Sequence, residues 1–179
     1  MKRIFVLLFI LLALVGCSNE GVKSDSIKDE STNNLSFEKQ IINVMTENQI
    51  KDVEIIDLDI KEDFVYIIFK NKQESGNTHN PDLVILENKE GKLKWVAGPD
   101  DRTGSVDSTL IFGRKDGPSV TITLPFTDTE IKEVNVLGES AKEVSYIQHI
   151  TDDFSREYKY WITYTEEIPK AEDINIITE

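Results

Sequence analysis

One change of hydrophobic period, just before residue 53, constrains the fold of this chain most. In residues 36–48, Ser36 can cap a helix and the following apolar residues recur at helical spacing. These residues are Phe37, Ile41, Val44 and Met45. From residue 53 to residue 60, apolar and polar residues mostly alternate, and residues 64–69 are continuously apolar and rich in aromatic and β-branched side chains. This change predicts one amphipathic helix of about three turns, followed by two paired strands joined near residues 61–63.

The rest of the chain carries strand patterns alone. Residues 83–86 and 93–96 flank Asn88-Lys89-Glu90-Gly91, whose glycine suits a short hairpin loop. After a break at residues 98–105 no helical period returns. Further strands are expected at 109–112, 120–124, 131–137, 143–150 and 157–165. The last five predict a small β-sandwich or an extension of the first sheet.

The expected fold class is therefore α+β, with one N-terminal amphipathic helix on an antiparallel sheet, followed by an all-β C-terminal part. The pattern of the first part resembles cystatin-like and nuclear transport factor 2-like proteins, in which a helix lies on a curved antiparallel sheet. This resemblance is one of pattern, because no diagnostic motif accompanies it.

The N-terminus has the organisation of a bacterial export signal. Lys2 and Arg3 precede an apolar run from Ile4 to Leu14, and the run is shorter than the ~20 apolar residues of a membrane span. The run ends in Leu14-Val15-Gly16-Cys17. The alternatives are an ordinary secretory signal whose cysteine is incidental, and an uncleaved anchor.

Leu14-Val15-Gly16-Cys17 resembles the lipobox of bacterial lipoproteins at all four positions. The resemblance implies cleavage between Gly16 and Cys17 and a diacylglycerol on the sulfur of Cys17. It also implies attachment to the extracytoplasmic face of the cell membrane. Because one acyl chain anchors a protein only marginally, a diacylglyceryl group is needed for stable attachment.

The composition of the sequence divides the chain into four expected segments. Residues 1–16 are the expected signal peptide, and residues 17–35 are expected to be a lipidated cysteine and a disordered tether with too few apolar residues to form a core. Residues 36–98 form an expected α+β unit and residues 107–176 a β-rich unit, with one continuous domain as the alternative. Cys17 is the sole cysteine, so the folded part must be stable without a disulfide.

Charge excludes one class of partner. Residues 1–16 carry two positive charges and no negative one, so their removal takes the formal charge from −13 to −15. Such an acidic chain lacks the clustered Lys and Arg that phosphate backbones require, so no nucleic-acid partner is expected.

The sequence contains no arrangement typical of a catalytic or metal site. Acidic pairs stand at residues 100–101 and 152–153, with Asp107 near the first, but without the spacing of a calcium loop. His79 and His149 are the only histidines, and neither has a second metal ligand nearby. Residues Asp57, Asp59, Lys61 and Asp63 alternate, so they would line one face of a strand and its turn, where a solvated surface is favoured over acid–base chemistry. We therefore expect no catalytic residue, no metal and no cofactor.

Residues 157–164 form the densest aromatic stretch. As a strand, this segment places Tyr158, Tyr160 and Tyr164 on one face, as a candidate surface for a glycan or a partner protein, with core packing as the favoured alternative. The expected function is a non-catalytic binding or accessory role of a membrane-anchored extracytoplasmic lipoprotein. The expected partners are the membrane, through the lipid on Cys17, and an envelope protein or glycan. A small-ligand or cell-wall-glycan binding lipoprotein, using the concavity of the first sheet, is the alternative.

Replacing Cys17 with Ala should abolish lipid attachment, because no other residue offers the thiol for the thioether. Metabolic labelling with a fatty-acid probe measures this directly. Label that persists on the Cys17→Ala protein would show that the lipid, if any, is attached elsewhere.

Overall fold

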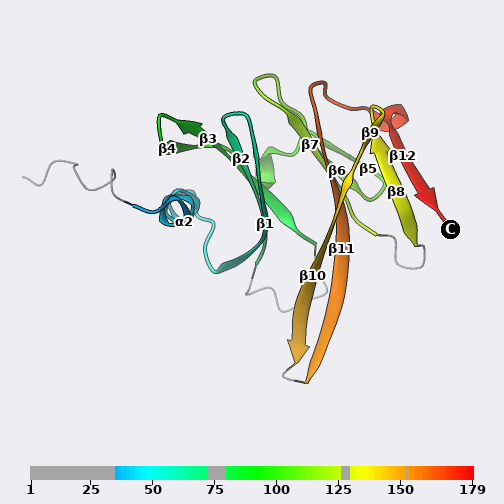
Figure 1. Cartoon of the computed structure of the whole chain (residues 1–179), viewed down its shortest axis with the longest axis horizontal. Coiled ribbons are helices and arrows are strands. Elements are labelled where there is room, and N and C mark those ends of the chain that lie inside the picture. The colour runs from blue at the N-terminus through cyan, green and yellow to red at the C-terminus, as the bar shows by residue number, and fades with distance from the viewer. Residues whose placement is uncertain (1–34, 72–79, 126–129, 152) are drawn as a thin grey trace, which may run out of the picture. The chain divides into compact units, whose positions relative to one another are not determined.

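The computed structural model describes residues 35–71, 80–125, 130–151 and 153–179, which hold one α-helix and twelve strands in antiparallel sheets (Figure 1). The helix is α2 (Phe37–Glu47), and two short 3-10 helices are η3 (Pro99–Asp101) and η4 (Ala171–Asp173). The strands are β1 (Val53–Lys61), β2 (Phe64–Asn71), β3 (Asp82–Lys89), β4 (Lys92–Ala97), β5 (Gly104–Val106), β6 (Thr109–Phe112), β7 (Ser119–Thr123), β8 (Ile131–Val136), β9 (Glu139–Ser140), β10 (Lys142–Thr151), β11 (Phe154–Thr165) and β12 (Ile174–Thr178). The lipobox, the tether, His79 and Asp152 lie outside the described residues.

Helix α2 begins and ends where its sequence allows. The Ser36 hydroxyl accepts a hydrogen bond from the Lys39 N–H at 3.4 Å, and Glu38 lies in the first turn, where a negative charge is favourable. Ile41 and Met45 are buried, and Val44 packs beside them. Phe37, which we expected on the same buried face, is 38% exposed because it lies at the first turn, at the edge of the contact. The predicted helix is therefore confirmed, with a shorter buried stripe.

The strands form three sheets. Sheet A is the meander β1-β2-β3-β4, sheet B has the order β10-β11-β7-β6-β5, and sheet C has the order β12-β8-β9. Figure 1 shows α2, sheet A, sheet B and sheet C following one another as layers.

Alternation along β2 and β3 explains this stacking. Val65, Ile67 and Val84 pack with α2 on one face of sheet A. Tyr66 and Ile68 point to the other face, where they share a core with sheet B. That core contains residues from both of the expected units, 36–98 and 107–176. Residues 36–179 form one compact unit. The buried members of that core are Tyr66, Ile68, Leu83, Ile85, Phe112, Val120, Ile122, Tyr160 and Ile162.

Sheet C was expected only in part. Its central strand β8 matches the predicted strand at 131–137, but β9 lies between that strand and the one predicted at 143–150, and β12 was not predicted. Likewise β5 occupies the end of the expected break at residues 98–105. These three strands are two to five residues long, and β5 and β9 carry almost no apolar alternation, so their pairing partners determine them.

Ile41 gives a direct test of the contact between α2 and sheet A. Because its side chain is 1% exposed, Ile41→Ala should lower the free energy of unfolding by roughly 2–5 kcal/mol. The neighbouring Ile42 is 42% exposed, so Ile42→Ala is a matched control that should change stability by less than about 0.5 kcal/mol. Equal effects of the two changes in urea unfolding would show that the helix does not pack as described.

Candidate functional site

Two edge strands, β1 of sheet A and β10 of sheet B, meet through charged side chains. The Lys142 ammonium lies 2.7 Å from Asp57 Oδ2 and 3.0 and 3.1 Å from the two Asp59 oxygens. The Tyr164 hydroxyl donates a hydrogen bond to Asp59 Oδ2 at 2.8 Å. We call Asp57, Asp59, Lys142, Tyr160 and Tyr164 the carboxylate–tyrosine cluster.

The local backbone explains why the two carboxylates face sheet B. The pairing of β1 with β2 shifts register between Ile55 and Asp57. Ile55 packs on the side of α2, whereas Ile56 packs against the core shared with sheet B. From Asp57 onward, every second residue then faces sheet B, as the contacts of Asp57 and Asp59 show.

The sequence predicted some of these residues but not their meeting. Asp57 and Asp59 were expected on one strand face, and Tyr160 and Tyr164 on another, and the structure brings the four together. Lys61 also joins them, with its ammonium 5.0 Å from the centre of the Tyr164 ring. Lys142 was missed, because a lone lysine at the start of a strand carries no signal of a partner more than eighty residues away.

Burial and the two carboxylates both raise the pKa values of the tyrosines, but they act in opposite directions on the pKa of Lys142. Burial raises the pKa of Tyr164 and of Tyr160 above the usual range, and the nearby Asp59 and Asp57 raise both further. Partial burial alone would lower the pKa of Lys142, but its hydrogen bonds to Asp57 and Asp59 outweigh burial and raise that pKa. The phenols therefore stay protonated, and the lysine stays charged, at neutral pH.

The contacts of Lys142 and Tyr164 with Asp57 and Asp59 join sheets A and B, and we call them the clasp. Both carboxylates are satisfied by one ammonium of this chain, and their side chains are only about 20% exposed. Since folding raises the pKa of Lys142, its contribution to stability is present at neutral pH and is lost as the pH rises through that raised pKa.

Further tyrosines lie along the β10–β11 hairpin beyond the clasp. Tyr146 stacks on Tyr158 with ring centres 5.7 Å apart, and Arg156 lies 5.4 Å from the Tyr158 ring centre. Tyr160 is fully buried, as core packing requires, so it offers no ring surface to a ligand. Tyr158 and Tyr164 are half-buried. Of the three candidate tyrosines, Tyr158 alone lies toward the distal part of the hairpin, beside the residues described next.

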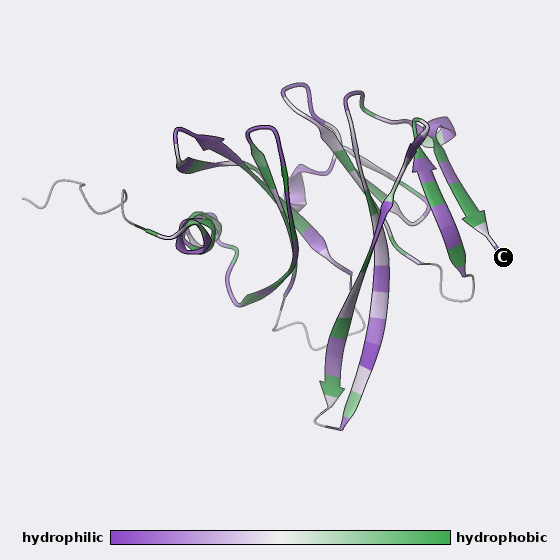
Figure 2. Cartoon of the chain, viewed as in Figure 1, coloured by the Kyte–Doolittle hydropathy of each residue, from purple (hydrophilic) through white to green (hydrophobic). Residues whose placement is uncertain are grey.

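The distal end of the β10–β11 hairpin exposes large apolar side chains. Ile147 is 60% exposed, Ile150 44% and Phe154 54%. We call these three residues the hairpin end, and Figure 2 shows hydrophobic residues there beyond the sandwich core. His149 of β10 shares a 2.7 Å hydrogen bond, through its Nδ1, with the Ser155 hydroxyl.

The remaining candidate residues lie apart from this region. Asp101 accepts a hydrogen bond from the Gly98 N–H at 2.8 Å, so it stabilises η3. Asp100 lies in η3, Asp107 and Asp153 lie in turns, and all three are exposed. Within the described residues, no three His, Cys, Asp or Glu side chains are placed to hold a metal ion.

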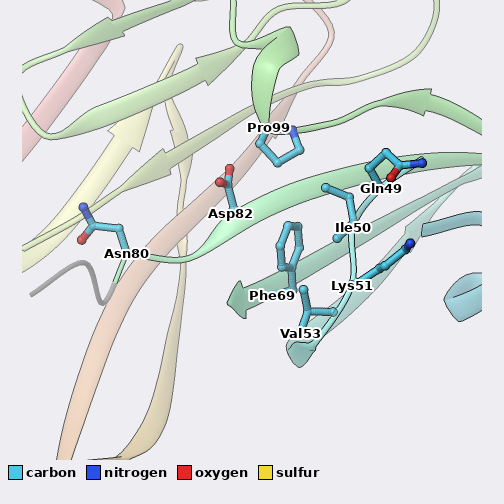
Figure 3. A pocket seen from close by; sticks show the side chains of 8 residues that line it. All are labelled: Gln49, Ile50, Lys51, Val53, Phe69, Asn80, Asp82 and Pro99. Atoms are coloured by element: carbon cyan, nitrogen blue, oxygen red, sulfur yellow. The ribbon is translucent and has the colours of Figure 1, made fainter. Parts of the chain in front are cut away.

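Sheet A has a small hollow at its end near η3. Figure 3 shows its lining, which includes Ile50, Phe69, Asp82 and Pro99. Its volume of about 150 Å³ is below the ~300 Å³ usual for small-molecule sites. Asp82 faces Arg102 there at 3.6 Å.

We compared the chain with known protein families, proteins and structures. No protein-family model, no curated protein and no solved structure matches this chain. In the described part of the chain, no helix has the length and apolar character needed to cross a membrane.

Replacing each of two tyrosines of the cluster by Phe should change the free energy of unfolding in different ways. Tyr164→Phe removes a hydrogen bond to a carboxylate and should cost about 1.5–3 kcal/mol of unfolding free energy. The Tyr160 hydroxyl is buried without a hydrogen-bond partner among the described residues, so Tyr160→Phe should leave stability unchanged or raise it. Urea unfolding of both variants measures the contrast. A larger loss for Tyr160→Phe than for Tyr164→Phe would contradict the clasp.

Proposed function

We propose that this protein is a membrane-anchored extracytoplasmic lipoprotein with a non-catalytic binding or accessory role at the cell envelope. The sequence Leu14-Val15-Gly16-Cys17 supports the anchor, and the polar stretch after Cys17 supports a tether. The absence of a nucleophile motif in the sequence supports a non-catalytic role.

The observation that carries the binding role is the hairpin end. Three large apolar side chains, Ile147, Ile150 and Phe154, are exposed near the end of one hairpin, with Ile147 on the face of Glu157 and Phe154 on the opposite face. Arg156 and Tyr158 lie on the same face of the hairpin as Phe154 and extend the contact area there with residue types that are common in interfaces.

We also propose the finer description of the fold, in which the N-terminal part is a cystatin-like or nuclear transport factor 2-like helix on a sheet and the C-terminal part is all-β. The packing of Ile41 and Met45 on β2 and β3 supports it. The core that sheets A and B share extends this description, because it joins both parts.

A second candidate function is binding of a small ligand or cell-wall glycan. The hollow of sheet A, which this alternative would use, is small. A second hollow, of about 380 Å³, is lined by Val106 and Asp107 on one side and by residues of η4 and β12 on the other.

Site-specific photo-crosslinking in intact cells tests the binding role. A photoreactive residue at Ile147 or Phe154 should yield one reproducible protein adduct, because both side chains are exposed at the hairpin end. The same residue at Ile60 of β1, which is 58% exposed, is the matched control and should not give that adduct.

The second arm of the experiment separates anchoring from binding. Cys17→Ala should release the protein from the membrane without changing the isolated domain's ability to form the adduct with purified partner. Adducts that are equal at Ile147 and Ile60, or absent at both hairpin positions, would contradict a partner at the hairpin end.

A further inference from the structure

Two edge strands, β5 of sheet B and β12 of sheet C, border the hollow of about 380 Å³. Val106 of β5 and the adjoining Asp107 line one side of it, and Ile174, Ile176 and Thr178 of β12 line the other. Among the described residues, β5 pairs with β6 alone and β12 with β8 alone. Each of the two strands therefore has one side that no other described strand covers.

The hydrogen bonds at the two ends of β12 show which of its backbone groups point away from β8. The Leu137 N–H donates to the Asp173 carbonyl at one end, and the Glu179 N–H donates to the Glu130 carbonyl at the other. Along an antiparallel strand, residues alternate between pointing their N–H and C=O groups toward a neighbour and away from it. The register shift before Thr178 adds its extra residue to β8, so the alternation along β12 continues. The odd-numbered residues of β12 therefore point toward β8, and the even-numbered residues point away.

The hollow lies at this free edge of β12. The even-numbered residues Ile174, Ile176 and Thr178 all line it, and so does Asn175, whose side chain is on the opposite face of the strand. Residues of both faces line one hollow where a strand turns its edge toward it. The Ile174 N–H is bonded to the Ala171 carbonyl. The Ile174 carbonyl and the backbone groups of Ile176 and Thr178 face the side of the hollow, where no described strand pairs with them.

The sequence of β12 leaves this edge open to pairing. Proteins commonly protect an exposed edge strand with charged side chains, and the edge strands β1, β4, β9 and β10 all contain them. Strand β12 reads Ile-Asn-Ile-Ile-Thr and holds no charge. The remaining edge strand, β5, reads Gly-Ser-Val and is also uncharged. The two uncharged edges thus border the same hollow, where an added strand would find a backbone template.

Carboxylates near this edge select its occupant. Asp107 is exposed and is the charged residue of the lining, and residues 170–173 hold two acids and one lysine. A second copy of this chain, paired antiparallel through its own β12 about Ile176, would place Asp173 opposite the other copy's Glu179. Like charges that lie opposite each other destabilise a sheet. These carboxylates therefore disfavour a second copy and favour a basic segment.

We infer that β12 binds an extended, basic segment of a partner protein, which adds to sheet C as an antiparallel strand and occupies the hollow beside β5. The segment pairs its backbone with the Ile174 carbonyl and with the free groups of Ile176 and Thr178. Its side chains alternate, so those opposite Ile174 and Ile176 face the hollow and are apolar. Lys or Arg residues that follow them meet Asp173 and Asp107.

This inference goes beyond the role proposed for the hairpin end. Strand β12 belongs to sheet C, whereas Ile150 and Phe154 lie at the end of a hairpin of sheet B. Phe154→Ser should therefore remove any adduct at the hairpin end and leave binding at β12 unchanged. Failure at one surface leaves the other to be judged on its own result.

The test uses the full chain in detergent, isotope-labelled for NMR, and the synthetic peptide acetyl-Val-Thr-Val-Thr-Val-Lys-Lys-amide as the probe. The middle valine is placed to pair with Ile176, and the lysines to meet Asp173. The peptide should shift the amide signals of Ile176 and Thr178 saturably and slow their hydrogen exchange, because both N–H groups become bonded. The same peptide ending in Glu-Glu should bind at least about tenfold more weakly.

Single hydrogen bonds provide matched controls. N-methylation of the middle valine removes the donor to the Ile176 carbonyl and should weaken binding at least about tenfold, whereas N-methylation of the next threonine, whose N–H points away from β12, should not. Thr178→Pro removes an N–H that faces the hollow and no bond to β8, so it should weaken binding to a similar extent. Thr178→Val keeps that N–H and should bind as the parent does.

Three results would overturn the inference. They are no saturable shift at Ile176 and Thr178, equal binding of the Lys-Lys and Glu-Glu peptides, and unchanged affinity after N-methylation of the middle valine. If Thr178→Pro fails to fold, the two methylated peptides decide. Protection of the two amides that rises with protein concentration in the absence of peptide would place a second copy on the edge, and would also overturn the inference.

Discussion

Burial of β2 and β3 on both faces is the constraint on which the rest of this structure depends. Val65 and Ile67 meet α2, while Tyr66 and Ile68 between them meet sheet B, and all four are at most 1% exposed. Without both contacts these strands would expose one apolar face to water. Helix α2 and sheet B are thus two covers for the same pair of strands. Tyr66 at this centre is fully buried, so its hydroxyl donates to the Pro118 carbonyl at 3.2 Å and burial raises its pKa to about 12.

The surfaces that could bind other molecules lie at the ends and outer layers of this stack. Strand β11 passes from the core at Tyr160 and Ile162 to the exposed Phe154, and so connects the stable centre to the hairpin end. On its other face the same strand places Trp161 and Thr163 against sheet C.

The sequence predicted those parts of the fold that local patterns determine. Helical spacing from Phe37 to Met45 gave the helix, and the apolar run 64–69 gave β2, because a buried strand requires such side chains whatever lies beside it. Local patterns could not reveal that Lys142 would meet Asp59, since that contact depends on how two sheets stack. Nor could they reveal that Thr121 and Thr163 would be buried side by side, because both read as ordinary strand residues until β7 and β11 are paired. The lipobox and the tether remain sequence predictions.

Hydrogen exchange of backbone amides tests the central claim, that the doubly buried strands hold the fold and sheet C is a peripheral layer. Trp161 is the one sheet B residue in the apolar cluster that sheet C forms, so β8 and β12 should exchange through a local opening that leaves sheet A intact. Amides of β2 and β3 should exchange only through global unfolding, with the highest free energy in the chain. If amides of β8 and β12 share that highest free energy, sheet C is part of the same cooperative core and the account is wrong.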